Sequence, residues 1–141
     1  MTPPLQIYLS FDGQCDAAFR FYEERLGATR GPAFPYANSP MAGDVPPEWG
    51  TKIMHASITI GGVTVAGAVQ PPGGYEPPKG FRMFLEPADA ADTERLFEAL
   101  AENGTIEMPL QSTFWSVRFG VLTDQFGIPW TLNCAQSPAA A

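Results

Sequence analysis

The chain has 141 residues, of which 45% are hydrophobic and 16% charged, a composition that suits one globular domain with a real core. Its formal net charge is −7, with eight Lys plus Arg residues and no basic run. This balance argues against nucleic acid and against an anionic membrane surface as partners. The first residues lack a signal-peptide pattern, and no segment approaches the ~18 apolar residues of a membrane span. We therefore expect a cytoplasmic protein.

The first half of the chain predicts a strand, a helix and a hairpin. Residues 5–11 form a short apolar run that fits a strand. Apolar residues then recur at helical spacing over 14–26, and Gly27 follows as a candidate C-cap. Later, the strand candidates 53–60 and 63–69 flank Gly61-Gly62, the strongest hairpin signal in the chain.

Between that helix and that hairpin, residues 31–50 are rich in Pro, Ala, Asn and Gly. Phe34, Tyr36 and Trp49 are embedded in this stretch. The composition predicts an extended loop that carries aromatic side chains, either as a lid or as an arm that reaches a partner.

The second half repeats the pattern of the first. Strand candidates at 81–86, 105–108, 115–123 and 128–134 accompany a helix that contains Thr93 and Leu100 and ends near Asn103-Gly104. A proline-rich linker at 70–79 separates the halves. We predict an α+β fold made of two βαβββ modules, with a concave cleft in a curled mixed sheet. Module one spans about 5–69, module two about 80–135 and a tail 136–141, all within a single domain 1–141.

Several segments of the chain resemble a known family. They are Tyr8 to Phe11, Ala18 to Tyr22 with Leu26-Gly27, Met54 to Gly62, and Phe114-Trp115 through Asn133-Cys134. Together they are similar to the PhnB-like branch of the glyoxalase, bleomycin-resistance and extradiol-dioxygenase (vicinal oxygen chelate) superfamily. The resemblance implies paired βαβββ modules, a ligand cleft and a homodimer. It also implies a divalent metal held by His, Gln and Glu.

The usual metal ligands of that superfamily are missing at the matching positions. The first strand offers Ile7, with Gln6 as its neighbour, and the end of the first hairpin offers Ala66. In the second half the matching residues are Arg82 and Thr131. A divalent metal needs carboxylates or neutral imidazoles, and the chain has one histidine. We therefore predict no metal and no other cofactor.

Strand alternation predicts which side chains face the cleft. Apolar positions that suit the helices are Met54, Ala56, Ile58, Ile60, Val63, Val65, Met83, Leu85, Val117, Phe119, Val121, Trp130 and Leu132. The opposite positions, expected in the cleft, are His55, Ser57, Thr59, Thr64, Ala66, Arg82, Phe84, Glu86, Ser116, Arg118, Thr131 and Asn133. Trp115 or Phe114 is expected at the rim.

Such a lining suits a small ligand with a planar or apolar body and an anionic group, because Arg binds oxyanions with parallel hydrogen bonds. Structural roles are open alternatives. His55 can be a hydrogen-bonded structural residue, Arg82 can pair with Glu86, and Trp115 can belong to the core or to a dimer contact. Asp124 is expected to shape its turn, and Asn133 to orient a ligand or satisfy backbone groups.

Two classes of function follow. The first is a metal-free protein that binds a small anionic or aromatic metabolite in a dimeric cleft through Arg82, Gln111, Trp115, Arg118, Thr131 and Asn133. The second is a lyase, isomerase or oxygenase that uses His55, Glu86 or Gln111 as acid, base or unusual metal ligand. The methyltransferase role sometimes given to PhnB-like chains is disfavoured, because Gly61-Gly62 lies in a hairpin rather than after a first parallel strand. Cys15 and Cys134 show no CxxC spacing, which favours two buried thiols over a redox pair.

Overall fold

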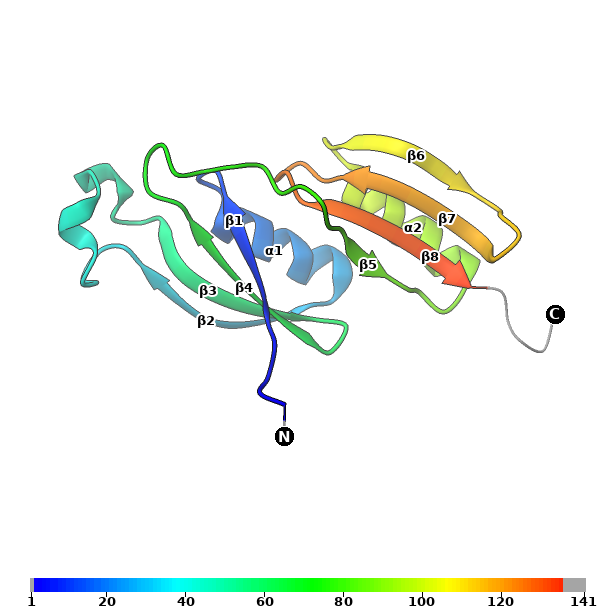
Figure 1. The fold of residues 1–141 in the computed structure, drawn as a ribbon, viewed down its shortest axis with the longest axis horizontal. Coiled ribbons are helices and arrows are strands. Elements are labelled where there is room, and N and C mark those ends of the chain that lie inside the picture. The colour runs from blue at the N-terminus through cyan, green and yellow to red at the C-terminus, as the bar shows by residue number, and fades with distance from the viewer. Residues whose placement is uncertain (1, 136–141) are drawn as a thin grey trace. The chain divides into compact units, whose positions relative to one another are not determined.

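The computed structural model describes residues 2–135, so the predicted tail 136–141 lies outside the described residues (Figure 1). The chain divides into two compact units, residues 1–76 and 77–141, and this division falls within the linker predicted at 70–79. We call the units module one and module two and describe each by itself. Neither of the two described α-helices is long and apolar enough to cross a membrane.

Module one contains a four-stranded sheet with one α-helix against it. Its elements are β1 (Ile7–Phe11), α1 (Cys15–Leu26), β2 (Thr29–Pro35), β3 (Ile53–Ile60) and β4 (Val63–Val69). The strand order is β1-β4-β3-β2, with β1 parallel to β4 and the other pairs antiparallel. As predicted, Gly27 ends α1 in the left-handed conformation (φ 70°), and Gly61-Gly62 joins β3 to β4.

Module two repeats this arrangement. Its elements are β5 (Met83–Leu85), α2 (Ala90–Ala101), β6 (Thr105–Gln111), β7 (Ser116–Thr123) and β8 (Pro129–Ala135). The strand order is β5-β8-β7-β6, with β5 parallel to β8. Asp89 caps α2 by accepting a hydrogen bond from the Asp92 backbone N–H. The predicted α+β fold with a repeated βαβββ unit is confirmed.

The stretch predicted as an extended loop begins with a strand. Residues 29–35 form β2 at the edge of the sheet. A proline has no backbone N–H to donate, and an edge strand tolerates Pro32 and Pro35 because one of its sides has no partner strand. The rest contains two 3-10 helices, Ala42–Asp44 and Pro47–Trp49. The segment that follows β2 is held against β4 by a hydrogen bond, which the Tyr36 hydroxyl donates to the Val69 carbonyl oxygen at 2.7 Å. The side chain of Tyr36 is therefore part of the core rather than of an extended arm.

Each helix approaches its sheet over a glycine. A Cβ on Gly67 of β4 would lie 2.6 Å from the Phe19 ring of α1, and a Cβ on Gly120 of β7 would lie 2.6 Å from the Phe97 ring of α2. Real side chains do not tolerate such distances, so both glycines permit close packing of a helical phenylalanine. They also mark the face of each sheet that the helix covers, so the other face has no α-helix from the described residues of its own module.

Candidate functional site

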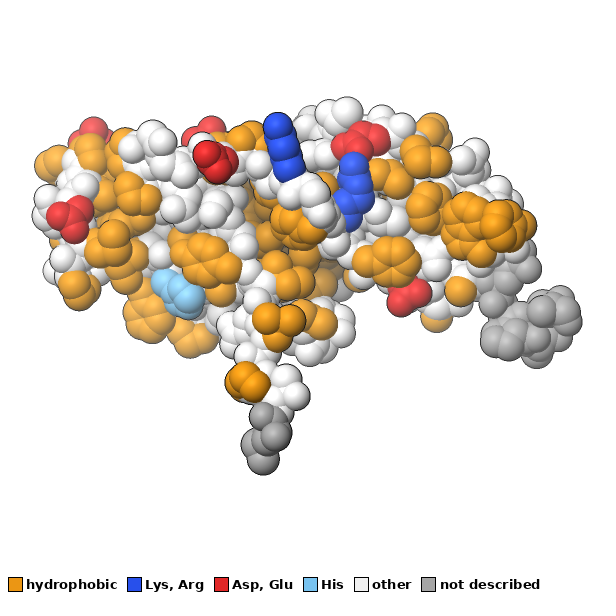
Figure 2. All heavy atoms as spheres, viewed as in Figure 1, with side chains coloured by type: hydrophobic (Ala, Val, Ile, Leu, Met, Phe, Trp, Pro, Cys, Tyr) orange, Lys and Arg blue, Asp and Glu red, His pale blue; other side chains and the backbone are white. Residues whose placement is uncertain are grey.

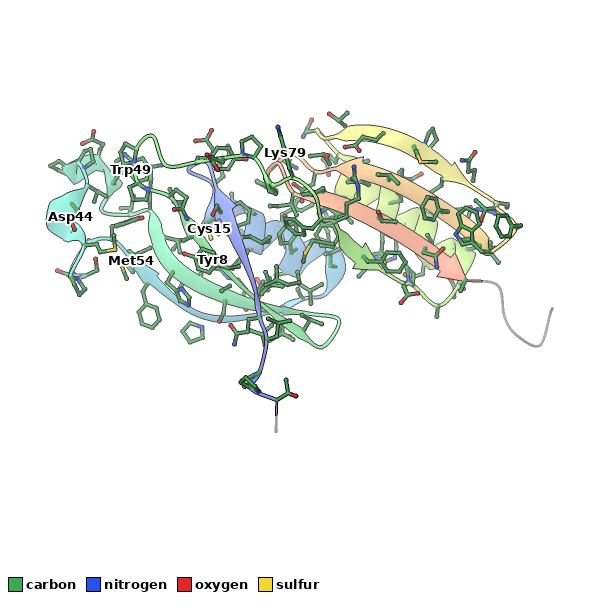
Figure 3. The ribbon with its side chains drawn as sticks, in the orientation of Figure 1. Tyr8, Cys15, Asp44, Trp49, Met54 and Lys79 are labelled. Atoms are coloured by element: carbon green, nitrogen blue, oxygen red, sulfur yellow. The ribbon has the colours of Figure 1, made fainter. Side chains whose placement is uncertain are left out.

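The helix-free face of module one carries exposed aromatic side chains over small residues. Gly67 faces α1, and strand alternation then turns Tyr8, Ala66 and Ser57 to the opposite face, where they lie side by side on β1, β4 and β3. Tyr8 is 54% exposed, and its ring centroid lies 6.3 Å from that of His55. Figure 3 labels Tyr8 on β1, and Figure 2 shows the histidine beside hydrophobic side chains.

His55 occupies the same face, as predicted. It is exposed and is the strand partner of Phe34 on β2, whose side chain is 53% exposed. We call Tyr8, Phe34, His55, Ser57, Ala66 and Ala68 the first open face. Sequence reasoning missed Phe34, because its strand was interpreted as a loop. It also missed Tyr8, although the buried neighbours Leu9 and Phe11 alternate in the way that places Tyr8 on this face.

The helix-free face of module two is fixed by the same argument. Gly120 faces α2, so its neighbours Phe119 and Val121 point to the opposite face with their strand partners Asn133 and Thr131. Phe84 pairs with Thr131 and is 57% exposed. We call Phe84, Phe119, Val121, Thr131 and Asn133 the second open face. In Figure 1, β7 and β8 pass in front of α2, so this face is turned toward the viewer.

An aromatic group extends this face toward the loop before β7. The Trp115 ring lies 5.6 Å from the Phe119 ring and 4.6 Å from the Phe114 ring, both edge to face. Trp115 is 48% exposed and Phe114 is 89% exposed. Figure 2 shows this concentration of hydrophobic side chains near the β6–β7 hairpin. Gln111, at the end of β6, is exposed and is the strand partner of Phe119.

The predicted orientation of β7 is wrong. Arg118 lies on the helix side, where its Nε atom is 3.0 Å from Glu94 Oε1 of α2. Ser116 is fully buried, and its hydroxyl hydrogen-bonds to the carbonyl oxygens of Arg118 and Cys134. The apolar residues Val117, Phe119 and Val121 were predicted to pack on the helix, but the helix instead covers Gly120, which has no side chain to reveal its direction. The prediction that Val63 packs inward is also wrong, because it is 46% exposed at the hairpin end.

Arg82 is already paired with a carboxylate. Its guanidinium forms an ion pair with Glu107 of β6, not with Glu86 as the sequence suggested, and a second nitrogen donates to the Leu122 carbonyl oxygen. Arg82, Glu107, Lys79 and Thr123 help to line a groove of about 610 Å³ in module two. The Thr123 hydroxyl and, after it, Arg82 lower the pKa of Glu107 by donating hydrogen bonds to its carboxylate.

The remaining candidates divide between the modules. Glu86 is exposed just after β5 in module two, whereas His55 belongs to module one. Asp124 is 3% exposed and accepts hydrogen bonds from the backbone of Phe126 and Ile128 and from the Trp130 indole, as expected for a residue that shapes its turn. Burial raises the pKa of the Cys15 thiol to about 12, so this thiol is protonated and unreactive at neutral pH. Cys15 and Cys134 are both free and buried.

A model of the Glyoxalase/Bleomycin resistance protein/Dioxygenase superfamily matches residues 5–132. Protein YjdN of Escherichia coli (strain K12) is 35% identical over 138 residues, which cover 92% of this chain and 94% of that protein. The chain belongs to this superfamily. The resemblance seen in the sequence is thereby confirmed.

Solved structures share this fold. Protein PA1353 from Pseudomonas aeruginosa superposes with a TM-score of 0.85 at 39% identity, covering 96% of this chain and 100% of that chain. A PhnB protein from Bacillus cereus superposes with a TM-score of 0.77 at 23% identity, covering 94% of this chain and 100% of that chain.

The metal common in this superfamily does not fit the residues present. The register of β1 on β4 places Tyr8, not Ile7, beside Ala66, and the register of β5 on β8 places Phe84, not Arg82, beside Thr131. Ala and Phe have no side-chain donor atoms, and Tyr and Thr are not among the His, Cys and carboxylate ligands that divalent metals usually take in proteins. The described residues contain no group of three or more His, Cys, Asp or Glu side chains placed to hold a metal. These positions therefore lack the ligand set that a divalent ion requires.

Proposed function

We propose that this protein binds a small planar aromatic molecule without a metal, and that the second open face is the binding surface. The observation that carries the proposal is the set of large aromatic side chains left exposed on a sheet face that no helix of its own module covers: Phe84, Trp115 and Phe114. Exposed rings beside a small number of polar groups are typical of small-molecule sites.

The charges favour an aromatic over an anionic ligand. Of the two arginines first assigned to the ligand, Arg118 lies on the helix side with Glu94, and Arg82 is neutralised by Glu107. A free oxyanion would have to displace a carboxylate from Arg82, and the whole chain carries a formal charge of −7. Stacking on rings needs neither a free cation nor a metal.

Ligand-observed NMR and thermal-shift measurements test this function directly. The EDTA-treated protein is mixed with three sets of compounds: neutral aromatics, aromatic carboxylates, and aliphatic anions such as succinate. We expect aromatic compounds to bind at micromolar to millimolar concentration and to raise the Tm. Trp115→Ala should weaken that binding, whereas Met41→Ala, which truncates a 39% exposed side chain in module one, should not. Binding of aliphatic anions alone, lost in Arg82→Ala, would contradict the proposal.

Elemental analysis of the purified protein tests its metal-free character. We expect zinc, manganese, nickel and iron each at far below one atom per chain. A stoichiometric metal that survives gel filtration, and whose removal abolishes ligand binding, would overturn this part of the proposal.

We also propose a homodimer and a cytoplasmic location. The exposed aromatic rings of each open face offer apolar surface to a second copy, and the edge strands β2 and β6 leave backbone groups unpaired. Two free, buried cysteines suit a reducing compartment. Light scattering at micromolar concentration should give twice the chain mass, and fractionation should place the protein in the cytoplasm.

Catalysis is a second candidate function, favoured by the exposed imidazole of His55 beside the Tyr8 phenol. An imidazole that reaches a bound molecule can act as a general acid or base. If the metal-free protein converts a molecule that binds at the first open face, His55→Gln should abolish this turnover while binding there persists. Binding without turnover leaves sequestration as the function.

A further inference from the structure

The side chain of Asn133 holds a buried hydrogen-bond acceptor that no described residue of the protein uses. Asn133 lies in β8 on the second open face and is 8% exposed. Among the described residues, its Oδ1 atom has less than 1 Å² of exposed area and no hydrogen-bond partner. A buried polar atom without a partner costs free energy, and folded proteins rarely keep one without a reason.

The fold itself does not require an asparagine at this position. The repeat allows a direct comparison: Tyr8 beside Ala66 in module one corresponds to Phe84 beside Thr131 in module two. Two residues further along each strand, module one has Ala68 where module two has Asn133. Ala68 is 2% exposed, so in module one a methyl group fills the corresponding buried position without any polar atom. Asn is also disfavoured within strands.

The surroundings of Asn133 suit a ring. Phe119 is its strand partner, and the Trp115 ring lies 5.6 Å from the Phe119 ring. On the other side of β8, Leu85 pairs with Leu132, and the exposed Glu86 is the next residue along the chain after β5. This carboxylate repels an anion but accepts a neutral or cationic molecule.

We propose that Asn133 selects the ligand of this face by accepting a hydrogen bond from it, and that the ligand is a neutral or cationic planar ring with an N–H or O–H donor. This inference rests on the proposed function, for which it names the ligand class. The Asn133 amide turns about its Cβ–Cγ bond to bring Oδ1 to the donor, a rotation with a broad energy minimum for this side chain. Aromatic contact with Trp115 and Phe119 holds the ring of the ligand, and Oδ1 of Asn133 accepts the hydrogen bond from the ligand's N–H or O–H group.

Matched pairs of probes separate the hydrogen bond from the aromatic contact. Phenol and anisole differ by methylation of the donor, as do benzimidazole and 1-methylbenzimidazole. We expect the wild-type protein to bind phenol and benzimidazole about tenfold more tightly than their methylated partners, by ligand-observed NMR titration. Asn133→Ala should bind both members of each pair equally and at the affinity of the methylated probe. Trp115→Ala should weaken all four probes and keep the tenfold ratio.

The unfolding equilibrium of the unliganded protein separates a ligand role from a structural one. Because Oδ1 has no partner among the described residues, Asn133→Ala should leave the urea midpoint unchanged or raise it. A lowered midpoint would show that the amide supports the fold, and would overturn the proposal. Equal affinity of wild type for both members of each pair would overturn it as well, while leaving the proposed function intact. Failure of all four probes to bind at millimolar concentration would instead reject the proposed function itself.

Discussion

The two open faces use one scaffold for two different surfaces. In module one the inner strand β4 presents Thr64, Ala66 and Ala68, and His55 lies on the neighbouring strand β3. In module two the inner strand β8 presents Thr131 and Asn133, and the position that corresponds to His55 holds Phe119. The imidazole of His55 thus lies on β3 in module one, whereas the amide of Asn133 lies on β8 in module two. Repetition of a fold therefore fixes where side chains point but not the chemistry they carry.

The helix-covered faces, in contrast, are nearly alike. Gly67 lies under Phe19 in module one, and Gly120 lies under Phe97 in module two, with the same closest distance of 2.6 Å to an added Cβ. The two modules therefore share this helix–sheet contact although their open faces differ. The following changes test how far the likeness between the modules extends.

The largest effect is expected from Gly67→Ala and Gly120→Ala. Each added methyl group must push a buried phenylalanine ring off its sheet, so each variant should lose about 2 kcal/mol of unfolding free energy in urea titrations. Gly43→Ala is the matched control, because no atom lies within 4 Å of its added Cβ, and its stability should stay near that of wild type. A large loss at one glycine only would mean that the two modules pack differently.

A smaller loss is expected at the hairpin that distinguishes the modules. β3 and β4 are joined by Gly61-Gly62 alone, whereas β7 and β8 are joined through Asp124, which accepts hydrogen bonds from two backbone N–H groups and the Trp130 indole. Asp124→Asn keeps the size but turns one acceptor into a donor that faces another donor. We expect a loss of about 1–2 kcal/mol, measured by thermal or urea unfolding.

The neighbouring Gln125→Ala is the control for that change. Gln125 is exposed, and its side chain makes one surface hydrogen bond to the Glu102 carbonyl oxygen. Its stability should be unchanged within about 0.5 kcal/mol. Equal losses for Asp124→Asn and Gln125→Ala would show that the turn does not depend on the buried carboxylate.

The sequence was sufficient for most of the fold. Helical periodicity and a terminal glycine located α1, and the Gly61-Gly62 pair located the β3–β4 hairpin, where both glycines have positive φ. These signals are local, so they survive without tertiary information. β2 was missed because its prolines and glycine resemble a loop, and only its edge position in the sheet makes them acceptable.

The site was less accessible to sequence reasoning. The face of β3 was predicted correctly because buried Ala56, Ile58 and Ile60 alternate with polar residues. On β7 one face carries Val117, Phe119 and Val121, whereas the other is interrupted by Gly120. The alternation alone therefore did not show which face the helix covers, and Arg118 was placed on the wrong side. The partners of Arg82 and Arg118 lie 25 and 24 residues away, a relation that no local pattern encodes.

A third change tests the corrected orientation of β7. Arg118→Met removes a partly exposed ion pair with Glu94, so we expect a loss of only about 0.5 kcal/mol in unfolding free energy. Because the side chain lies on the helix side, the affinity for aromatic probes should be unchanged in the NMR titration. A large loss of affinity would restore Arg118 to the ligand-binding surface and refute the assignment of faces made from Gly120.

The smallest effect concerns the polar end of module two, which has no counterpart among the ion pairs described for module one. Glu107 has its pKa lowered below the ordinary value of 4.5, first by the Thr123 hydroxyl and then by Arg82. A carboxylate whose pKa is lower in the folded state stabilises the protein above the unfolded value and loses that contribution as the pH falls through the folded value. Glu107→Gln should therefore be slightly less stable than wild type at pH 7, and the difference should be smaller at about pH 3 than at pH 7. Since Arg82 and Glu107 are 37% and 35% exposed, solvent screens the pair and keeps the difference small.

Urea titrations of wild type and Glu107→Gln at the two pH values measure this difference in unfolding free energy. A difference that grows as the pH falls would mean that Glu107 is stabilised in its protonated form, against the hydrogen bonds that it accepts here.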